Sequence, residues 1–168
     1  MRAGAGLILC AVLLAFRGPA QAEDAAATYA TRNLTPEVAL KAAQAALKKC
    51  RDSGWQVAVA VVDRSGVVQV VLRDRYAGAH TPRTAAGKAW TAVSFRSDTG
   101  ALVDPTQPGK AQSGVRNLSH VVILGGGVII EGGGQMLGGV GVSGAPGGEA
   151  DESCARAGIA AIQESLEF

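Results

Sequence analysis

The sequence has few of the residues that carry charge, aromatic surface or metal ligands. Of its 168 residues, 18% are charged and 4% are aromatic, and there are only three cysteines and two histidines. Three cysteines are too few for a small fold held together mainly by disulfides, and 48% hydrophobic residues exclude a disordered chain. The length suits one ordinary domain with a single core.

Long apolar runs are also scarce, apart from one near the N-terminus. Leu7 to Phe16 is unbroken apolar sequence, which follows Arg2 and precedes the small-x-small pattern Ala20-Gln21-Ala22. A basic start, a short apolar run and such a pattern are typical of a secretory signal peptide. The run is too short to span a bilayer, which needs roughly 20 residues. We therefore expect residues 1–22 to be removed after Ala22, no membrane span, and a periplasmic or secreted protein.

Removal of that segment changes the charge and the cysteine count. Loss of Arg2 and Arg17 brings the 16 basic residues level with the 14 acidic ones, so no basic surface for nucleic acid is expected. Cys50 and Cys154 remain, and an oxidising compartment permits a disulfide between them. Two small buried apolar residues are the alternative. A structural zinc site is not expected, because the four residues Cys50, His80, His120 and Cys154 are too widely spaced in the sequence.

The mature chain alternates helix and strand patterns. We expect residues 23–33 to form a flexible lead and residues 34–168 a single domain. Helices are expected to begin at Thr35-Pro36, where Thr is the N-cap, and at Thr81-Pro82 in the same way, and a last helix follows Gly147-Gly148-Glu149. Strands are expected at about 56–63, 67–72, 119–124, 127–131 and 135–143.

This order, α-β-β-α-β-β-β-α, predicts an α/β (α+β) fold. The residues Asp63-Arg64-Ser65-Gly66 suit a tight turn, so the first two strands should form a hairpin. Short connections force antiparallel pairing, and helices must cover the apolar faces of the sheet. We therefore predict a five-stranded antiparallel sheet flanked by helices, with residues 98–117 as a surface loop.

A glycine pattern near the C-terminus matches a nucleotide-binding fingerprint. Gly139 to Gly144 reads G-x-G-x-x-G, but the remaining chain offers one helix and no returning strand, which a dinucleotide site requires. The glycines are better explained by close packing of backbone. An anion at the following helix N-terminus is disfavoured, because Glu149, Asp151 and Glu152 already complement the helix dipole there.

His80 is the best candidate ligand in the sequence. It lies at the start of the second helix, where the helix dipole disfavours imidazolium, and a neutral imidazole is a good axial ligand for heme iron. Arg73, Arg75 and Arg83 are close in sequence and could face the two heme carboxylates. The alternative is an exposed loop histidine among solvated charges. His120 is expected to be a strand residue whose ring is hydrogen-bonded.

Several separated motifs resemble the GlcG/HbpS family, also called the heme-degrading domain family. The resemblance extends from about Leu34 to Phe168. The matching stretches, in order, are Val61-Val62-Asp63, Gly66, Arg73, Lys88-Ala89-Trp90-Thr91-Ala92, Gly141 to Gly144, and Asp151 to Gly158.

The resemblance implies a profilin-like fold, a homo-oligomer and, in exported members, heme binding. The resemblance leaves the axial ligand of the heme iron open between histidine and threonine. His80 and Thr81 are the matching candidates in this sequence. The leading hypothesis is an exported heme-binding protein for heme capture, buffering or sensing.

Two other hypotheses stay open. One is an enzyme or accessory factor for a small metabolite, associated with glycolate or corrinoid metabolism, that binds an acid near Arg73 and Lys88; heme degradation belongs to the same class. The other is an assembly module without a ligand, because small sheets with aliphatic faces pair readily.

Overall fold

The computed structural model describes residues 27–167, so the expected signal peptide and the first part of the lead lie outside the described residues. The chain divides into two units, residues 1–31 and 32–168, and the helices and strands below belong to the second. Residues 27–34 have no regular secondary structure. In residues 27–167 no helix combines the length and the hydropathy needed to cross a membrane.

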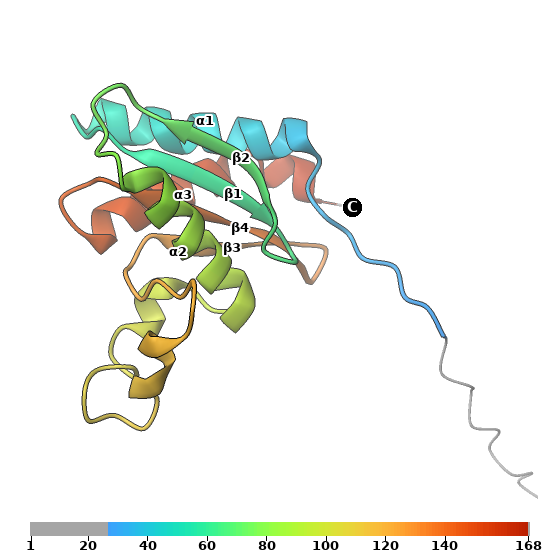
Figure 1. Ribbon diagram of the computed structural model, residues 1–168. Helices are drawn as coiled ribbons and strands as arrows, with labels where there is room; N and C mark the ends of the chain where they lie inside the picture. The colour runs from blue at the N-terminus through green and yellow to red at the C-terminus, as the bar shows by residue number, and fades with distance from the viewer. Residues whose placement is uncertain (1–26, 168) are drawn as a thin grey trace, which may run out of the picture. The chain divides into compact units, whose positions relative to one another are not determined.

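Four strands form one antiparallel sheet in the order β2-β1-β4-β3 (Figure 1). The strands are β1 (Ala58–Asp63), β2 (Val68–Arg73), β3 (Gly127–Gly132) and β4 (Gln135–Ser143), and the α-helices are α1 (Pro36–Asp52), α2 (Thr81–Phe95) and α3 (Gly148–Ala160). Three short 3-10 helices complete the chain: η1 (Thr99–Leu102), η2 (Ser113–Asn117) and η3 (Gln163–Leu166).

The prediction of five strands is wrong, because residues 119–124 are not a strand. His120 has a left-handed backbone, with φ of 68°, which breaks an extended segment. The amide of Val122 donates to Thr91 Oγ1 on α2 rather than to a neighbouring strand. The segment therefore packs along α2, with Val122 against Gly87 of that helix. The order of elements differs accordingly, with η1 and η2 between α2 and β3.

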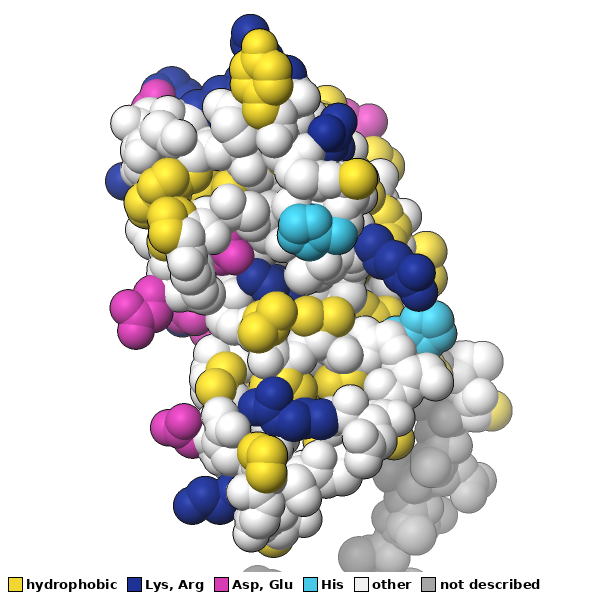
Figure 2. Space-filling view, turned by 60° about the vertical axis from the view of Figure 1, so that its left-hand side comes forward, with side chains coloured by type: hydrophobic (Ala, Val, Ile, Leu, Met, Phe, Trp, Pro, Cys, Tyr) yellow, Lys and Arg dark blue, Asp and Glu magenta, His cyan; other side chains and the backbone are white. Residues whose placement is uncertain are grey.

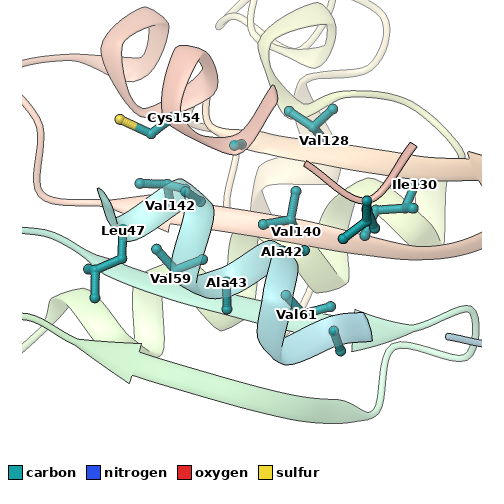
Figure 3. Close-up of a cluster of buried hydrophobic side chains, with 14 of the residues drawn as sticks. Ala42, Ala43, Leu47, Val59, Val61, Val128, Ile130, Val140, Val142 and Cys154 are labelled. Carbon is teal, nitrogen blue, oxygen red and sulfur yellow. The ribbon is translucent and has the colours of Figure 1, made fainter. Parts of the chain in front are cut away.

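The alternation of side chains along β1 assigns the two faces of the sheet. Val57, Val59 and Val61 point into the main core with α1, α3 and η3, part of which Figure 3 shows. Ala58 and Ala60 on the opposite face contact Ala85 of α2. The sheet is thus covered by α1 and α3 on one face and by α2 on the other, and both faces of β1 are buried.

The helix starts follow two different patterns. Thr35 is the N-cap of α1, as predicted, and accepts a hydrogen bond from the Val38 amide. At α2 the prediction is wrong in detail: His80 is the N-cap, and Thr81 is the first helical residue. The Thr81 hydroxyl donates to the Gly78 carbonyl at 2.8 Å, so it closes the preceding turn instead of accepting from a helix amide.

Gly141 explains why strand β4 is rich in glycine. A Cβ atom at Gly141 would lie 2.0 Å from the Ala85 carbonyl oxygen and 2.7 Å from the Ala89 amide nitrogen. Only a residue without a side chain lets the α2 backbone lie this close to the sheet. The expectation that the fingerprint-like glycines serve close packing is therefore confirmed at this position.

Candidate functional site

Two hollows share the start of α2 as a common wall. The larger groove has a volume of about 1040 Å³, and the smaller cleft about 570 Å³. His80 and Thr84 line both of them. Both volumes lie near the range of roughly 300–1,000 Å³ typical of ligand pockets.

The larger groove has apolar walls and three cationic or imidazole side chains. Its apolar lining consists of Val68, Ala79, Ala86, Trp90, Val121 and Val122. His80, Arg83 and His120 lie in the same lining, and all three are exposed to solvent. Figure 2 shows both histidines of the chain on one face of the molecule, with a Lys or Arg side chain between them.

The His80 ring is positioned by the chain around it. The ring folds back over Gly78, where a Cβ atom would lie 2.8 Å from one of its carbons and 2.9 Å from Nδ1. The His80 carbonyl accepts from the amide and the hydroxyl of Thr84, which fixes the backbone at the helix start. Within residues 27–167 neither ring nitrogen of His80 makes a hydrogen bond. The ring therefore lies beside Gly78, and its nitrogens stay available.

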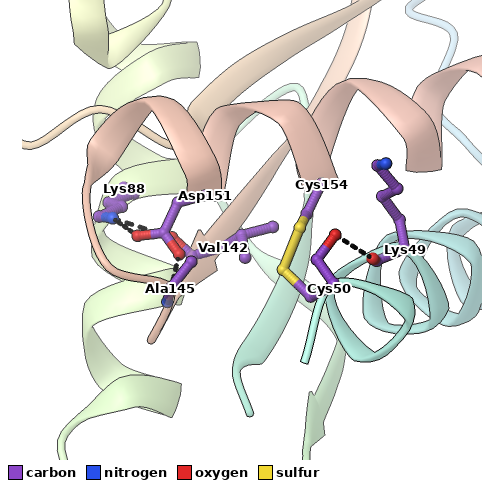
Figure 4. The surroundings of a disulfide bond; sticks show 8 residues. Lys49, Cys50, Lys88, Val142, Ala145, Asp151 and Cys154 are labelled. Carbon is purple, nitrogen blue, oxygen red and sulfur yellow. Dashed lines mark hydrogen bonds and ion pairs between the residues drawn. A yellow bond between two sulfur atoms is a disulfide. The ribbon is translucent and has the colours of Figure 1, made fainter. Parts of the chain in front are cut away.

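The smaller cleft is polar and contains a buried ion pair. Lys88 Nζ lies 2.7 Å from Asp151 Oδ2 and donates at 2.9 Å to the Val142 carbonyl, as Figure 4 shows. The Lys88 and Asp151 side chains are only 3% and 6% exposed. The Lys88 ammonium is already neutralised, so we do not assign it to a heme carboxylate.

Burial raises the pKa of Asp151 above its ordinary value, because the charged carboxylate loses water. Its bonds to Lys88 and to the Ala145 amide act in the opposite direction. The sequence predicts that the Asp151 carboxylate complements the helix dipole at the N-terminus of α3. The structure adds a tertiary role, since Asp151 joins α3 to α2.

The remaining predicted site residues lie apart from one another. Arg73 Nε donates to the Ala77 carbonyl at 2.9 Å, which closes the loop between β2 and α2. Arg75 is exposed, and neither Arg73 nor Arg75 is among the described residues that line the two hollows. Thr81 is 1% exposed and borders only the smaller cleft. The structure thus brings His80 and Arg83 together in one hollow, and His80, Thr81 and Lys88 in the other.

Cys50 and Cys154 form a disulfide, with their Cα atoms 5.6 Å apart (Figure 4). Cys50 is in the last turn of α1 and Cys154 is in α3. Both belong to the main core on the face of the sheet opposite α2. The bond therefore fastens the layer that does not contain the larger groove.

Sequence reasoning missed two features of this region. The prediction that His120 is a strand residue with a hydrogen-bonded ring is wrong: its side chain is exposed in the larger groove and makes no hydrogen bond within residues 27–167. Its ring contacts Trp90 instead, with the centroids 6.0 Å apart. Asp74 is 1% exposed and pairs with Arg51 on α1 at 2.6 Å. No local pattern in the sequence signals either contact.

A match to a family model assigns the chain to a known family. Residues 34–160 match the family described as "Haem degrading protein HbpS-like". The chain belongs to this family.

Two solved structures and one curated relative show how far the similarity extends. A double mutant of Streptomyces reticuli HbpS is 35% identical, with a TM-score of 0.75, and the match covers 95% of this chain and 99% of that one. The crystal structure of a PduOC:heme complex is 32% identical, with a TM-score of 0.72, covering 77% and 95%. The corrinoid adenosyltransferase PduO of Salmonella typhimurium is 36% identical over 121 residues, which are 71% of this chain and 36% of that protein.

Proposed function

We propose that this protein binds heme in the larger groove, with His80 as an axial ligand of the iron. The observation that carries the proposal is the His80 ring: it lies beside Gly78, is exposed to the groove and is free of hydrogen bonds within the described residues. Neutral imidazole is a common axial ligand of heme. The heme named in the PduOC complex, from a chain of the same fold, supports the same cofactor here.

The residues of the groove fit the chemistry of heme. A porphyrin is a flat apolar disc with two carboxylates, and the groove combines apolar walls with the Arg83 guanidinium. Arginine pairs with carboxylates through charge-assisted hydrogen bonds. Bound heme would supply a redox-active iron, while the chain supplies the ligand, the apolar walls and the cation.

His80 is a better ligand candidate than Thr81. The Thr81 hydroxyl is buried and already donates to the Gly78 carbonyl, and it borders the smaller cleft only. Ligation by Thr81 would require that turn to open. The His80 ring needs no such change.

A heme titration followed by absorption tests the proposal. Saturable binding with a Soret shift is expected at micromolar heme, and His80→Ala should change the spectrum. Arg83→Ala should weaken binding by up to about fivefold, since an ion pair of an exposed side chain contributes roughly 0.2–1 kcal/mol. Arg75→Ala is the matched control, because Arg75 lines neither hollow, and it should bind as the wild type does. Absence of a saturable shift would refute heme binding, and an unchanged spectrum in His80→Ala would exclude His80 as the ligand.

The smaller cleft supports a second candidate function, binding of a small polar metabolite. Gln56 lines this cleft, and its buried Oε1 has no hydrogen-bond partner within the described residues. An unpaired buried acceptor is costly, so a ligand that donates to it would bind favourably. The PduO relatives are corrinoid adenosyltransferases, and they support a role of this protein in cofactor metabolism. The chain spans only 36% of their length. A thermal-shift screen of small acids and amides, with Gln56→Leu as the control, tests this.

We also propose export and self-association. The Cys50–Cys154 disulfide supports export, because disulfides persist in oxidising compartments. Mass spectrometry of the protein recovered from an expressing cell's periplasm should find cleavage after Ala22.

The exposed edge valines Val67, Val68 and Val71 support self-association through β2. Light scattering of the purified protein tests that proposal.

A further inference from the structure

We propose that the smaller cleft binds an uncharged carboxamide or lactam, held by the side-chain amide of Gln56 and the hydroxyl of Ser143. This inference rests on the second candidate function, binding of a small polar metabolite in this cleft, and it names the chemical class of that metabolite. It is independent of heme binding in the larger groove.

The first argument is that Gln56 and Ser143 lie next to each other on the sheet side of the cleft, and both line it. Val142 points into the main core, so Ser143 points to the opposite face of the sheet, toward α2. Ser143 pairs with Ala58 of β1, and Gln56 lies two positions before Ala58. A Cβ atom at Gly144 would lie 2.7 Å from the Gln56 carbonyl oxygen, so the two backbone segments are in contact there.

The polar groups that α2 contributes to the cleft already have partners. Thr81, Thr84 and Lys88 line the cleft at spacings of three and four residues, which puts them on one side of the helix. Both hydroxyls donate to backbone carbonyls just before them in the chain. The Lys88 ammonium donates to the Asp151 carboxylate and to a backbone carbonyl of β4. These groups have little hydrogen-bonding capacity left for a ligand.

The second argument is that the side chains of Gln56 and Ser143 have no such partners. Gln56 Oε1 is buried and unpaired. Within residues 27–167 neither the amide nitrogen of Gln56 nor the hydroxyl of Ser143 makes a hydrogen bond, although Ser143 is only 5% exposed. Buried polar groups left unpaired cost free energy, so a ligand that pairs with them gains affinity.

The Gln56 amide also sets the shape of the partner group. It offers a carbonyl acceptor and an N–H donor side by side. A carboxamide or a lactam has the same two groups in the complementary order, and it can therefore form two parallel hydrogen bonds with Gln56. The Ser143 hydroxyl can donate to the second lone pair of the ligand carbonyl or accept from its second N–H.

The third argument is the charge of the cleft. Apart from the imidazole of His80, the only acidic or basic side chains among the described residues that line it are Lys88 and Asp151. These two lie 2.7 Å apart and neutralise each other, as Figure 4 shows. A carboxylate ligand would lose water there without gaining a free cation. The structure therefore favours an uncharged ligand over the acid expected from the sequence near Arg73 and Lys88.

The N-terminus of α3 does not change this balance of charge. It borders the cleft at Gly148, and its free amides would by themselves attract an anion. The first turn of α3 already carries the acids Glu149 and Asp151, which offset the positive end of the helix dipole. An anion at this position would meet their repulsion.

Two exposed side chains at the cleft suit a ligand with a flat ring. Tyr76 is 80% exposed and Leu124 is 56% exposed, and both line the cleft. They come from different segments, the loop between β2 and α2 and the segment that precedes β3. A planar ring that carries the amide would bury part of this apolar surface. An aromatic carboxamide is therefore the probe of choice.

The test is a titration of the full protein with nicotinamide, and with nicotinate as the matched acid, followed by NMR chemical shifts. A pH of about 8 keeps free imidazole mostly uncharged. Nicotinamide should bind saturably, with a Kd of about 1 mM or tighter, and nicotinate should bind about tenfold more weakly or less. Gln56→Leu should weaken nicotinamide binding by about tenfold or more, and Ser143→Ala by about twofold to tenfold. Neither variant should lower the Tm, because neither side chain makes a hydrogen bond within the described part of the chain.

Gln69→Leu is the matched control. Gln69 Oε1 is also buried and unpaired, but Gln69 lies on β2 and is not among the described residues that line the cleft. An unpaired glutamine oxygen outside the cleft should contribute nothing to binding. Gln69→Leu should therefore bind nicotinamide as the wild type does.

The outcomes separate this inference from the function on which it rests. Nicotinate binding as tightly as nicotinamide would overturn the amide class and leave metabolite binding in the cleft intact. Nicotinamide affinity that is unchanged in Gln56→Leu would overturn the inference as well. If neither probe binds saturably, the inference is wrong, and the thermal-shift screen decides separately whether the cleft binds a metabolite of another class. Preference for nicotinamide that is lost in Gln56→Leu and kept in Gln69→Leu is the result that supports it.

Discussion

At the scale of single residues, two buried carboxylates show how partners decide the behaviour of a charge. Asp74 lies against the Arg51 guanidinium, and the hydrogen bonds from Arg51 lower the pKa of that carboxyl despite its burial. Asp151 pairs with Lys88, yet burial dominates and raises the pKa of Asp151. The pKa values of the two aspartates therefore shift in opposite directions from the ordinary value.

The pH dependence of stability should reveal the Asp74 pair. Because the folded state lowers the pKa of Asp74 below its ordinary value of 3.8, the pair stabilises the fold above that pH. The contribution is lost as the pH falls further, through the lower pKa of the folded state. Asp74→Asn should lower the Tm at neutral pH and flatten the acid side of the Tm profile. Thermal unfolding between about pH 7 and pH 2 measures both effects, with the ordinary carboxyl range as the reference.

Asp52→Asn is the matched control for this measurement. Asp52 pairs with Lys48 four residues earlier on the same helix, but both side chains are more than half exposed. Exposed pairs of this kind contribute little. Equal Tm profiles for Asp74→Asn and Asp52→Asn would contradict the assignment of acid sensitivity to Asp74.

At the scale of elements, local patterns predict helices and hairpins well and isolated strands poorly. The N-cap Thr35 and the turn at Asp63 to Gly66 depend on neighbouring residues alone, and the structure contains both. Residues 119–124 have the apolar composition of a strand, but they lie along α2 because His120 bends the chain and Thr91 takes the Val122 amide. A partner 31 positions away cannot be read from the segment itself. The same holds for the candidate site. The place of His80 could be predicted from the local pattern at the helix start, whereas the place of His120 depends on tertiary packing.

Contact between α2 and β4 should depend on Gly141. Gly141→Ala adds a methyl group that the Ala85 carbonyl oxygen would meet at 2.0 Å. Backbone cannot yield as a flexible side chain does, so we expect a loss of about 1–3 kcal/mol or more in the free energy of unfolding. Urea unfolding measures it. Gly114→Ala is the control, since nothing lies within 4 Å of its added Cβ, and it should stay within about 0.5 kcal/mol of the wild type. Similar midpoints for the two variants would refute close packing as the role of Gly141.

At the scale of the domain formed by residues 32–168, the two faces of the sheet have different roles. The face covered by α1 and α3 holds the main core and the disulfide. The buried apolar clusters on the face covered by α2 consist of alanines and valines, with half-buried Met136 packed against one of them, and the larger groove lies along the helix. His80, the proposed axial ligand, therefore lies on the side of the sheet covered by α2, while the covalent bond stabilises the other side.

This separation predicts that loss of the disulfide weakens the fold without weakening the site. The bond joins residues 104 positions apart, and closing a loop of about 100 residues contributes up to roughly 4.7 kcal/mol through the unfolded state. The double variant Cys50→Ala, Cys154→Ala should lose about 2–5 kcal/mol in urea unfolding. Reductant should lower the wild-type midpoint and leave that of the double variant unchanged, which controls for other effects of the reagent. At urea concentrations where the variant stays folded, its heme affinity should match that of the wild type, because the groove residues belong to α2 and its neighbours on the opposite face. A parallel loss of stability and heme affinity would show that the two faces are coupled through the sheet.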